Sequence, residues 1–138
     1  MNAKEYLSRA IQIEREIKSQ LEYLSVLRTL VTKATAAVSD MPGSPTRNTC
    51  KMEDAIMKII EQEELIDAEI DRLVDCKKAM QLSIERVENP EYRQVLRMRY
   101  LAFKSWNEVA AVMHYNVRHV YRIHKEALKS FIPPQDVS

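Results

Sequence analysis

Cations and one tyrosine recur at helical spacing in the segment 117–131. Arg118, Tyr121, Arg122 and Lys125 are three or four residues apart, so a helix would present them on one face. Arginine can form bidentate hydrogen bonds with guanine, whereas lysine and tyrosine can contact phosphates. The segment contains a single acidic residue. This composition favours contact with double-stranded DNA over a merely solvated helix face, which is the plain alternative.

A second, shorter helix is predicted just before this one. The motif SWNE is a capping box, in which the Ser105 hydroxyl and the Glu108 carboxylate serve the first backbone N–H groups. Asn116 is a favourable cap for the longer helix, which we expect to run to about Ile132 before two prolines. A short helix, a tight turn and a longer basic helix form the helix-turn-helix arrangement, whose second helix enters the major groove with its N-terminal end.

Apolar residues at helical spacing would hold these helices together. We expect Ala110 and Ala111 where the two helices cross. A further helix is predicted over residues 90–103, because Asn89 and Pro90 are a typical cap and first residue. The inward positions of the three helices are Tyr92, Val95, Leu96, Tyr100, Phe103, Trp106, Val109, Met113, Val120, Ile123, Ala127 and Leu128.

Two long amphipathic helices are predicted upstream, over residues 3–38 and 49–87, with a loop at 39–48 that holds two prolines and the only glycine. Sustained heptad spacing indicates an antiparallel coiled-coil hairpin. The principal rows are Ala10, Ile17, Leu24, Val31 and Val38 on the first helix, and Met52, Ile59, Ile66, Leu73, Met80 and Val87 on the second. On the first helix, the second row contains Leu7, Leu21 and their heptad partners, and Ile13 and Leu27 lie alongside it. On the second helix, the second row is Ile56, Glu63, Ile70, Lys77 and Ile84.

Charges within the second rows suggest a register in which paired residue numbers sum to 91. Glu14 then faces Lys77, Arg28 faces Glu63, and Thr35 faces Ile56. The sequence thus predicts an all-α protein: a helical hairpin at 1–88, a helix-turn-helix domain at 89–132 and a disordered tail at 133–138.

Composition narrows the function further. Residues 1–89 carry 13 Lys or Arg against 16 Asp or Glu, and residues 90–138 carry 8 against 4, so the basic charge lies in the part expected to bind DNA. One glycine in the chain disfavours phosphate-binding loops, and no nucleophile motif is visible, so we expect neither an enzyme nor a cofactor. No signal peptide or membrane span is expected, and two cysteines 26 residues apart indicate free thiols in a reducing cytoplasm.

The three histidines could suggest a metal site. They are five residues apart, at 114, 119 and 124, and that spacing does not place side chains on one helix face. We expect no metal, with His119 facing DNA or solvent and His124 at the domain surface.

The segment YRQVLRMRYLAFKSWNEVAAVMHYNVRHVYRIHKEALKSF resembles the DNA-binding fourth region of bacterial sigma factors. Nearly the whole chain is similar to small phage-encoded transcriptional regulators of Gram-positive bacteria, of the ArpU and RinA type. The resemblance implies double-stranded DNA as partner, with contacts to bases and phosphates from Asn116, Val117, Arg118, His119, Tyr121 and Arg122, joined by Lys125 from the helical pattern. Arg97, Lys104, Ser105 and Trp106 are candidates for contacts with the DNA backbone. The related turn has glycine where this chain has His114.

Three functions are consistent with the sequence. The first is a sequence-specific transcriptional regulator, with the hairpin binding RNA polymerase or forming a homodimer. We expect it to be an activator or accessory factor and not a complete sigma factor, because nothing resembles the promoter-melting region. The second is a DNA-packaging protein like a phage small terminase subunit, although such proteins usually place the DNA-binding part first. The third is a coiled-coil adaptor whose basic domain binds protein.

Overall fold

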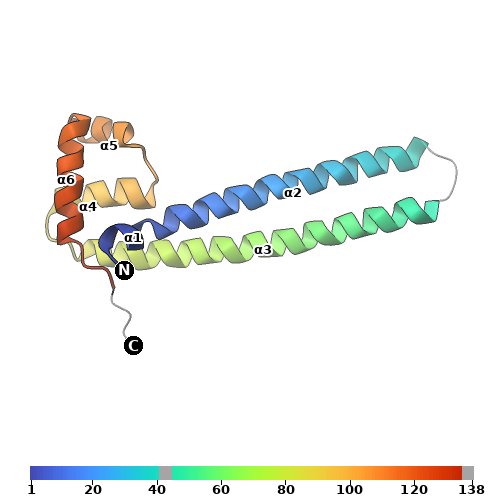
Figure 1. Cartoon of the computed structure of the whole chain (residues 1–138), viewed down its shortest axis with the longest axis horizontal. Helices are drawn as coiled ribbons and strands as arrows, with labels where there is room; N and C mark the ends of the chain where they lie inside the picture. The colour runs from blue at the N-terminus through green and yellow to red at the C-terminus, as the bar shows by residue number, and fades with distance from the viewer. Residues whose placement is uncertain (41–44, 135–138) are drawn as a thin grey trace. The chain divides into compact units, whose positions relative to one another are not determined.

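The computed structural model describes residues 1–40 and 45–134, with side-chain environments for 1–36 and 50–134. All regular elements in these ranges are helices, which confirms the predicted all-α class, and the fold is shown in Figure 1. The helices are α1 (Ala3–Leu7), α2 (Arg9–Asp40), α3 (Pro45–Glu85), α4 (Pro90–Leu96), the π-helix η1 (Arg97–Leu101), α5 (Trp106–Met113) and α6 (Val117–Ser130).

The chain forms two compact units. The hairpin unit comprises residues 14–72, and the terminal unit comprises residues 1–13 and 73–138. The division differs from the predicted one at residue 88, because both ends of the hairpin pack with the last helices. Tyr6 stacks on Phe131 with ring centroids 5.9 Å apart, and Arg93 donates to the Val87 carbonyl at 2.6 Å.

In the hairpin unit, α2 and α3 run side by side in opposite directions (Figure 1). Both principal rows are confirmed, since each member with a described side chain is buried or half-buried. The second rows are confirmed only in part: Leu7, Ile84 and the adjoining Ile13 and Leu27 are buried, whereas Leu21, Ile56 and Ile70 are exposed. Through most of the hairpin the less exposed rows lie one residue earlier, at Ile13, Gln20, Leu27 and Ala34 on α2, and at Ala55, Gln62, Glu69, Cys76 and Ser83 on α3.

Polar side chains set the alignment of this seam. The buried Gln62 donates from Nε2 to the Gln20 carbonyl at 3.2 Å and also to the Gln20 side-chain oxygen. A buried polar layer of this kind opposes sliding of the two helices, because a shifted register would leave the amides without partners.

One predicted pair of the hairpin register is confirmed, since Arg28 and Glu63 form an ion pair at 3.1 Å. The register with paired numbers summing to 91 is nevertheless wrong. Thr35 lies 4.0 Å from the Met52 sulfur rather than opposite Ile56, and Gln62 contacts the Gln20 carbonyl, so these pairs sum to 87 and 82. The Arg28–Glu63 pair forms because both side chains are long and exposed.

The ends of the long helices differ from the predicted ones. The first helix breaks at Ser8, a turn residue between α1 and α2. Part of the predicted loop is helical, because α2 continues to Asp40 and α3 already begins at Pro45; residues 41–44 lie outside the described residues. Proline suits the first turn of α3, where its missing N–H would have no helical partner. Asn2 caps α1 as expected, accepting from the Glu5 N–H at 2.8 Å.

The third predicted helix ends earlier as an α-helix and widens into a π-helix. Asn89 caps α4, but the helix changes after Leu96 into the π-turn of η1. Phe103, predicted to lie inside that helix, instead has φ of 57°. A left-handed non-glycine residue costs on the order of 1 kcal/mol. The Lys77 ammonium lies 4.3 Å from the centroid of the Phe103 ring, a cation–π contact that favours this conformation.

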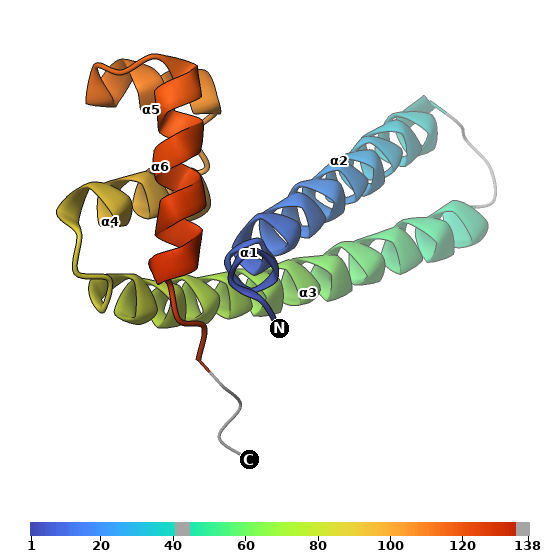
Figure 2. The same cartoon turned by 60° about the vertical axis from the view of Figure 1, so that its left-hand side comes forward.

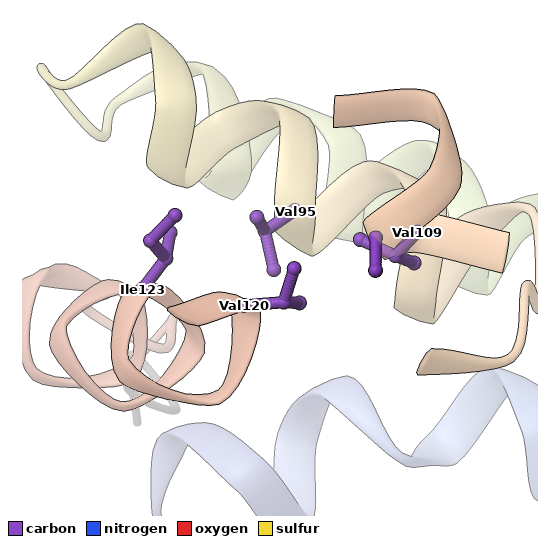
Figure 3. Packing of buried hydrophobic residues seen from close by; sticks show 5 residues of the cluster. Val95, Val109, Val120 and Ile123 are labelled. Carbon is purple, nitrogen blue, oxygen red and sulfur yellow. The ribbon is translucent and has the colours of Figure 1, made fainter. Parts of the chain in front are cut away.

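Valines from three helices form the core of the terminal unit. Val95, Val109, Val120 and Ile123 come from α4, α5 and α6 and point toward one another (Figure 3). Ala110 is also buried, as expected at the crossing of α5 and α6, whereas Ala111 is exposed and the prediction for it is wrong. Figure 2 shows α6 crossing α4, with α5 beside the N-terminal end of α6. The core thus fixes which face of α6 remains outside.

Candidate nucleic-acid interface

The helix α6 has two chemically opposite faces. Val120, Ile123 and Ala127 are buried in the core, and burial of each contributes on the order of 1–2 kcal/mol. The opposite face presents cations and a tyrosine, all of them exposed: Arg118, Tyr121, Arg122 and Lys125. This set is called the cationic face below.

The acid nearest to the cationic face is already engaged. Glu126 lies 3.4 Å from the Lys129 ammonium, one turn along α6. Both groups are exposed, so the pair is weak. It nevertheless places the carboxylate toward Lys129 at the C-terminal end, leaving the N-terminal half of α6 basic.

The first turn of α6 is held by its cap. The Asn116 side-chain oxygen accepts from the His119 N–H at 2.7 Å. That oxygen is therefore engaged, and only the amide NH₂ of this predicted DNA-binding residue can donate outward. Val117 is half-buried and packs against the core cluster, so it does not belong to the cationic face.

The turn between α5 and α6 is left-handed at His114, with φ of 60° and ψ of 37°. The position where related turns have glycine thus keeps the conformation that glycine favours. The next residue fastens the turn from two sides. Tyr115 donates its hydroxyl to Glu91 at 2.7 Å, which raises the pKa of the phenol, and its ring meets His119 edge-on at 4.5 Å.

Trp106 lies at the centre of an aromatic and cationic cluster. Its ring lies 4.5 Å from the Arg99 guanidinium and 5.3 Å from the Tyr121 ring, which it meets edge-on. The half-buried indole was predicted to contact the DNA backbone. In this position it orients Tyr121, whose own ring remains 49% exposed on the cationic face.

His124 closes the cluster from the inside. Its ring lies 4.5 Å from Trp106, and Nε2 lies 2.6 Å from the Tyr100 hydroxyl. Burial lowers the pKa of His124 to about 4, with smaller contributions from the positive charges of Lys4 and Arg99. The neutral imidazole accepts from the tyrosine hydroxyl. The predicted position of His124 at the domain surface is therefore wrong. His124 lies on the inner flank of α6 with the buried Val120, four positions earlier, and Ala127, three positions later.

The other candidates for backbone contacts are partly committed to the protein. Arg97 donates from Nε to Gln81 at 3.2 Å and lines a cavity of about 460 Å³ with Glu91 and Met98. Lys104 is half-buried, and its carbonyl accepts from Arg99 at 3.0 Å. Ser105 is exposed, but its hydroxyl accepts from the Glu108 N–H at 3.2 Å.

Sequence patterns did not reveal the supporting roles of Arg99, Tyr115 and His124, and they gave Tyr100 only as an inward residue. The partners of these residues lie 5 to 24 residues away along the chain. The one available signal was the position of His124, four residues after the inward Val120. That spacing places both on one flank of a helix.

Two features are absent from the part of the chain that the structure describes. In residues 1–40 and 45–134, no three His, Cys, Asp or Glu side chains gather in a group suited to a metal ion. Over the same ranges, no helix is both long and apolar enough to cross a membrane.

The comparisons with known proteins give a family without an assigned activity. Residues 27–132 match the family model described as "Protein of unknown function (DUF722)". No curated protein matches the chain. No solved structure matches it either. Because the matched segment covers more than half of the sequence, the chain belongs to the DUF722 family.

Proposed function

We propose that this protein is a sequence-specific DNA-binding transcriptional regulator that inserts α6 into the major groove. The observation that carries the proposal is the cationic face. It lies opposite the buried face of a capped helix and directly after a short helix and a left-handed turn. This arrangement leaves the outer face of the N-terminal half of α6 exposed and rich in groups that read bases and bind phosphates.

The chemistry assigns different tasks to the members of the face. Arg118 and Arg122 are one turn apart near the N-terminal end, where a helix in the groove reaches base edges, so they would read guanine. Lys125 and the Tyr121 hydroxyl would contact phosphates, which position the protein without carrying sequence information. The His119 ring packs against the Tyr115 ring, and the part of the imidazole that Tyr115 does not cover would contact DNA.

The biological role follows the resemblance to the fourth sigma region and remains part of the proposal. We infer an activator of phage genes in the cytoplasm of a bacterial host, acting with RNA polymerase. The helical hairpin is the part available for contact with the polymerase or with a second copy of the chain.

Alanine variants of the two arginines test the proposal. Specific DNA is first selected from a random duplex pool by the whole protein. We expect Arg118→Ala and Arg122→Ala each to lower discrimination between the selected and scrambled duplexes by about 1–3 kcal/mol. The matched control is Lys129→Ala, which removes an exposed cation from the other end of the same helix. Unchanged discrimination in both arginine variants would exclude α6 as the reading helix.

Location of the bound site separates the regulator from a packaging protein. A regulator should protect a promoter-proximal site in phage DNA, whereas protection of a packaging site alone would favour the terminase-like alternative. Binding that does not depend on salt would favour the adaptor, since phosphate contacts release counterions and weaken as salt rises.

A further inference from the structure

The hairpin unit carries an apolar strip that its own seam does not use. It consists of residues that each follow a seam residue by one position on α2 or α3. The Arg28–Glu63 ion pair at 3.1 Å connects its two halves across the helices. The residues of this side strip are Leu21, Arg28, Ile56, Ile60, Glu63 and Ile70. Its four apolar members are 41–46% exposed, although each is a large aliphatic side chain.

The width of the apolar surface on α3 exceeds what one partner helix covers. A two-helix seam needs two apolar positions in each heptad, whereas a helix of a four-helix bundle needs about three. Ile56, Ile60 and Ile70 supply such a third row beside the seam formed by Ile59 and Ile66. The pattern therefore fits further helices lying against this side.

The charges around the strip indicate which helices these are. Residues 14–36 of α2 carry four basic and three acidic residues, whereas residues 50–72 of α3 carry three basic and eight acidic ones. Lys18 on α2 and Asp67 on α3 flank the strip, beside the Arg28–Glu63 ion pair that lies within it; all four side chains are exposed. In a dimer with two-fold symmetry, the acidic α3 of each copy can lie against the less acidic α2 of the other copy.

We propose that two copies of this chain associate through the side strip, with α2 of each hairpin against α3 of the other, to form an antiparallel four-helix bundle. The apolar members of both strips become buried, and the flanking charges pair between copies. The inference does not rest on DNA binding, and it can be tested with DNA absent.

Sedimentation of the whole protein, followed by a pair of charge variants, tests this arrangement. The wild type should sediment as a dimer at micromolar concentration. A variant with Glu63→Lys and Asp67→Lys makes both helices basic at the strip, and one with Lys18→Glu and Arg28→Glu makes both acidic. Each variant alone should dimerise at least about tenfold more weakly, because like charges then face each other. Mixed in equal amounts, the two variants should form a heterodimer.

The self-association of each variant alone identifies the paired helices, because mixing brings opposite charges together in either arrangement. If α2 met α2 and α3 met α3, like charges would already face each other in the wild type, and each variant alone would self-associate as well as the wild type does. That result, or a wild type that stays monomeric, would overturn the proposal. Recovery on mixing also shows that both variants are folded. If mixing fails and circular dichroism shows native helix content in both variants, the proposal is likewise wrong.

An independent pair of apolar variants separates the side strip from the opposite side of α2. Ile60→Ser should weaken the dimer, because Ile60 belongs to the strip. Val26→Ser is the matched control: Val26 is 54% exposed but lies outside the strip. A stronger effect of the Val26 variant would place the interface on the other side.

Discussion

Protonation of His124 should destabilise the terminal unit in a defined pH range. The folded pKa is about 4, against 6.5 for a free histidine, because the half-buried ring is desolvated and lies near Lys4 and Arg99. The neutral form is favoured by the fold. Its contribution is therefore fully present above pH 6.5 and is lost as the pH falls from 6.5 toward 4.

The size of this effect follows from the difference in pKa. A fall from 6.5 to about 4 corresponds to about 3 kcal/mol for a fully buried group. His124 is half-buried, so solvent screening reduces the expected loss to about 1–2 kcal/mol.

The matched variant is His124→Gln, which keeps a hydrogen-bond acceptor for the Tyr100 hydroxyl but does not titrate. Urea unfolding followed by the fluorescence of Trp106, the only tryptophan, reports on this cluster directly. Between pH 7.5 and 4.5 the free energy of unfolding should fall by about 1–2 kcal/mol more in the wild type than in the variant. All other titrating groups are shared, so equal pH dependence in the two proteins would refute this account of His124.

Three further substitutions test how the helix-turn-helix is held together, each by urea unfolding. Val120→Ala should lower the free energy of unfolding by about 2 kcal/mol, since Val120 is fully buried between α4 and α5; a loss below about 0.5 kcal/mol would contradict that packing. Asn116→Ala should cost about 1 kcal/mol by removing the acceptor for the His119 N–H, whereas Asn116→Asp should restore most of it. His114→Gly should stabilise by up to about 1 kcal/mol, because the left-handed φ of 60° suits glycine; a destabilised variant would show that the imidazole itself matters.

Helix starts and inward faces near the C-terminus could be predicted from sequence because they rest on local chemistry. Asn89, Ser105 and Asn116 each have a short polar side chain before an apolar periodic run, and each caps a helix. Val120 and Ile123 could be assigned to the core for the same reason, because the helical repeat of about 3.6 residues places both on one face of the helix.

The second row of the hairpin seam could not be predicted in this way. Periodicity favours the row with more apolar residues, which contains Ile56 and Ile70. The helices instead pack through Ala55, Gln62 and Cys76, which are small or can hydrogen-bond across the seam. The choice between neighbouring rows depends on how closely two helices approach, and that is a property of both helices together.

The supporting cluster around Trp106 was also beyond sequence reasoning. Arg99 lies within the π-helix η1, which moves it relative to a regular α-helix, and Phe103 then reverses the chain through a left-handed conformation. Neither feature has a local signature in these residues. The contacts with Trp106 and His124 depend on both.

The account depends most on whether the cationic face of α6 binds a DNA duplex. The direct measurement is the affinity of the whole protein for the selected duplex as salt is raised from about 50 to 200 mM. With about three to five phosphates contacted, the affinity should fall by roughly 40- to 500-fold. Failure to bind any duplex at the lowest salt, or an affinity unchanged across this range, would contradict the central claim.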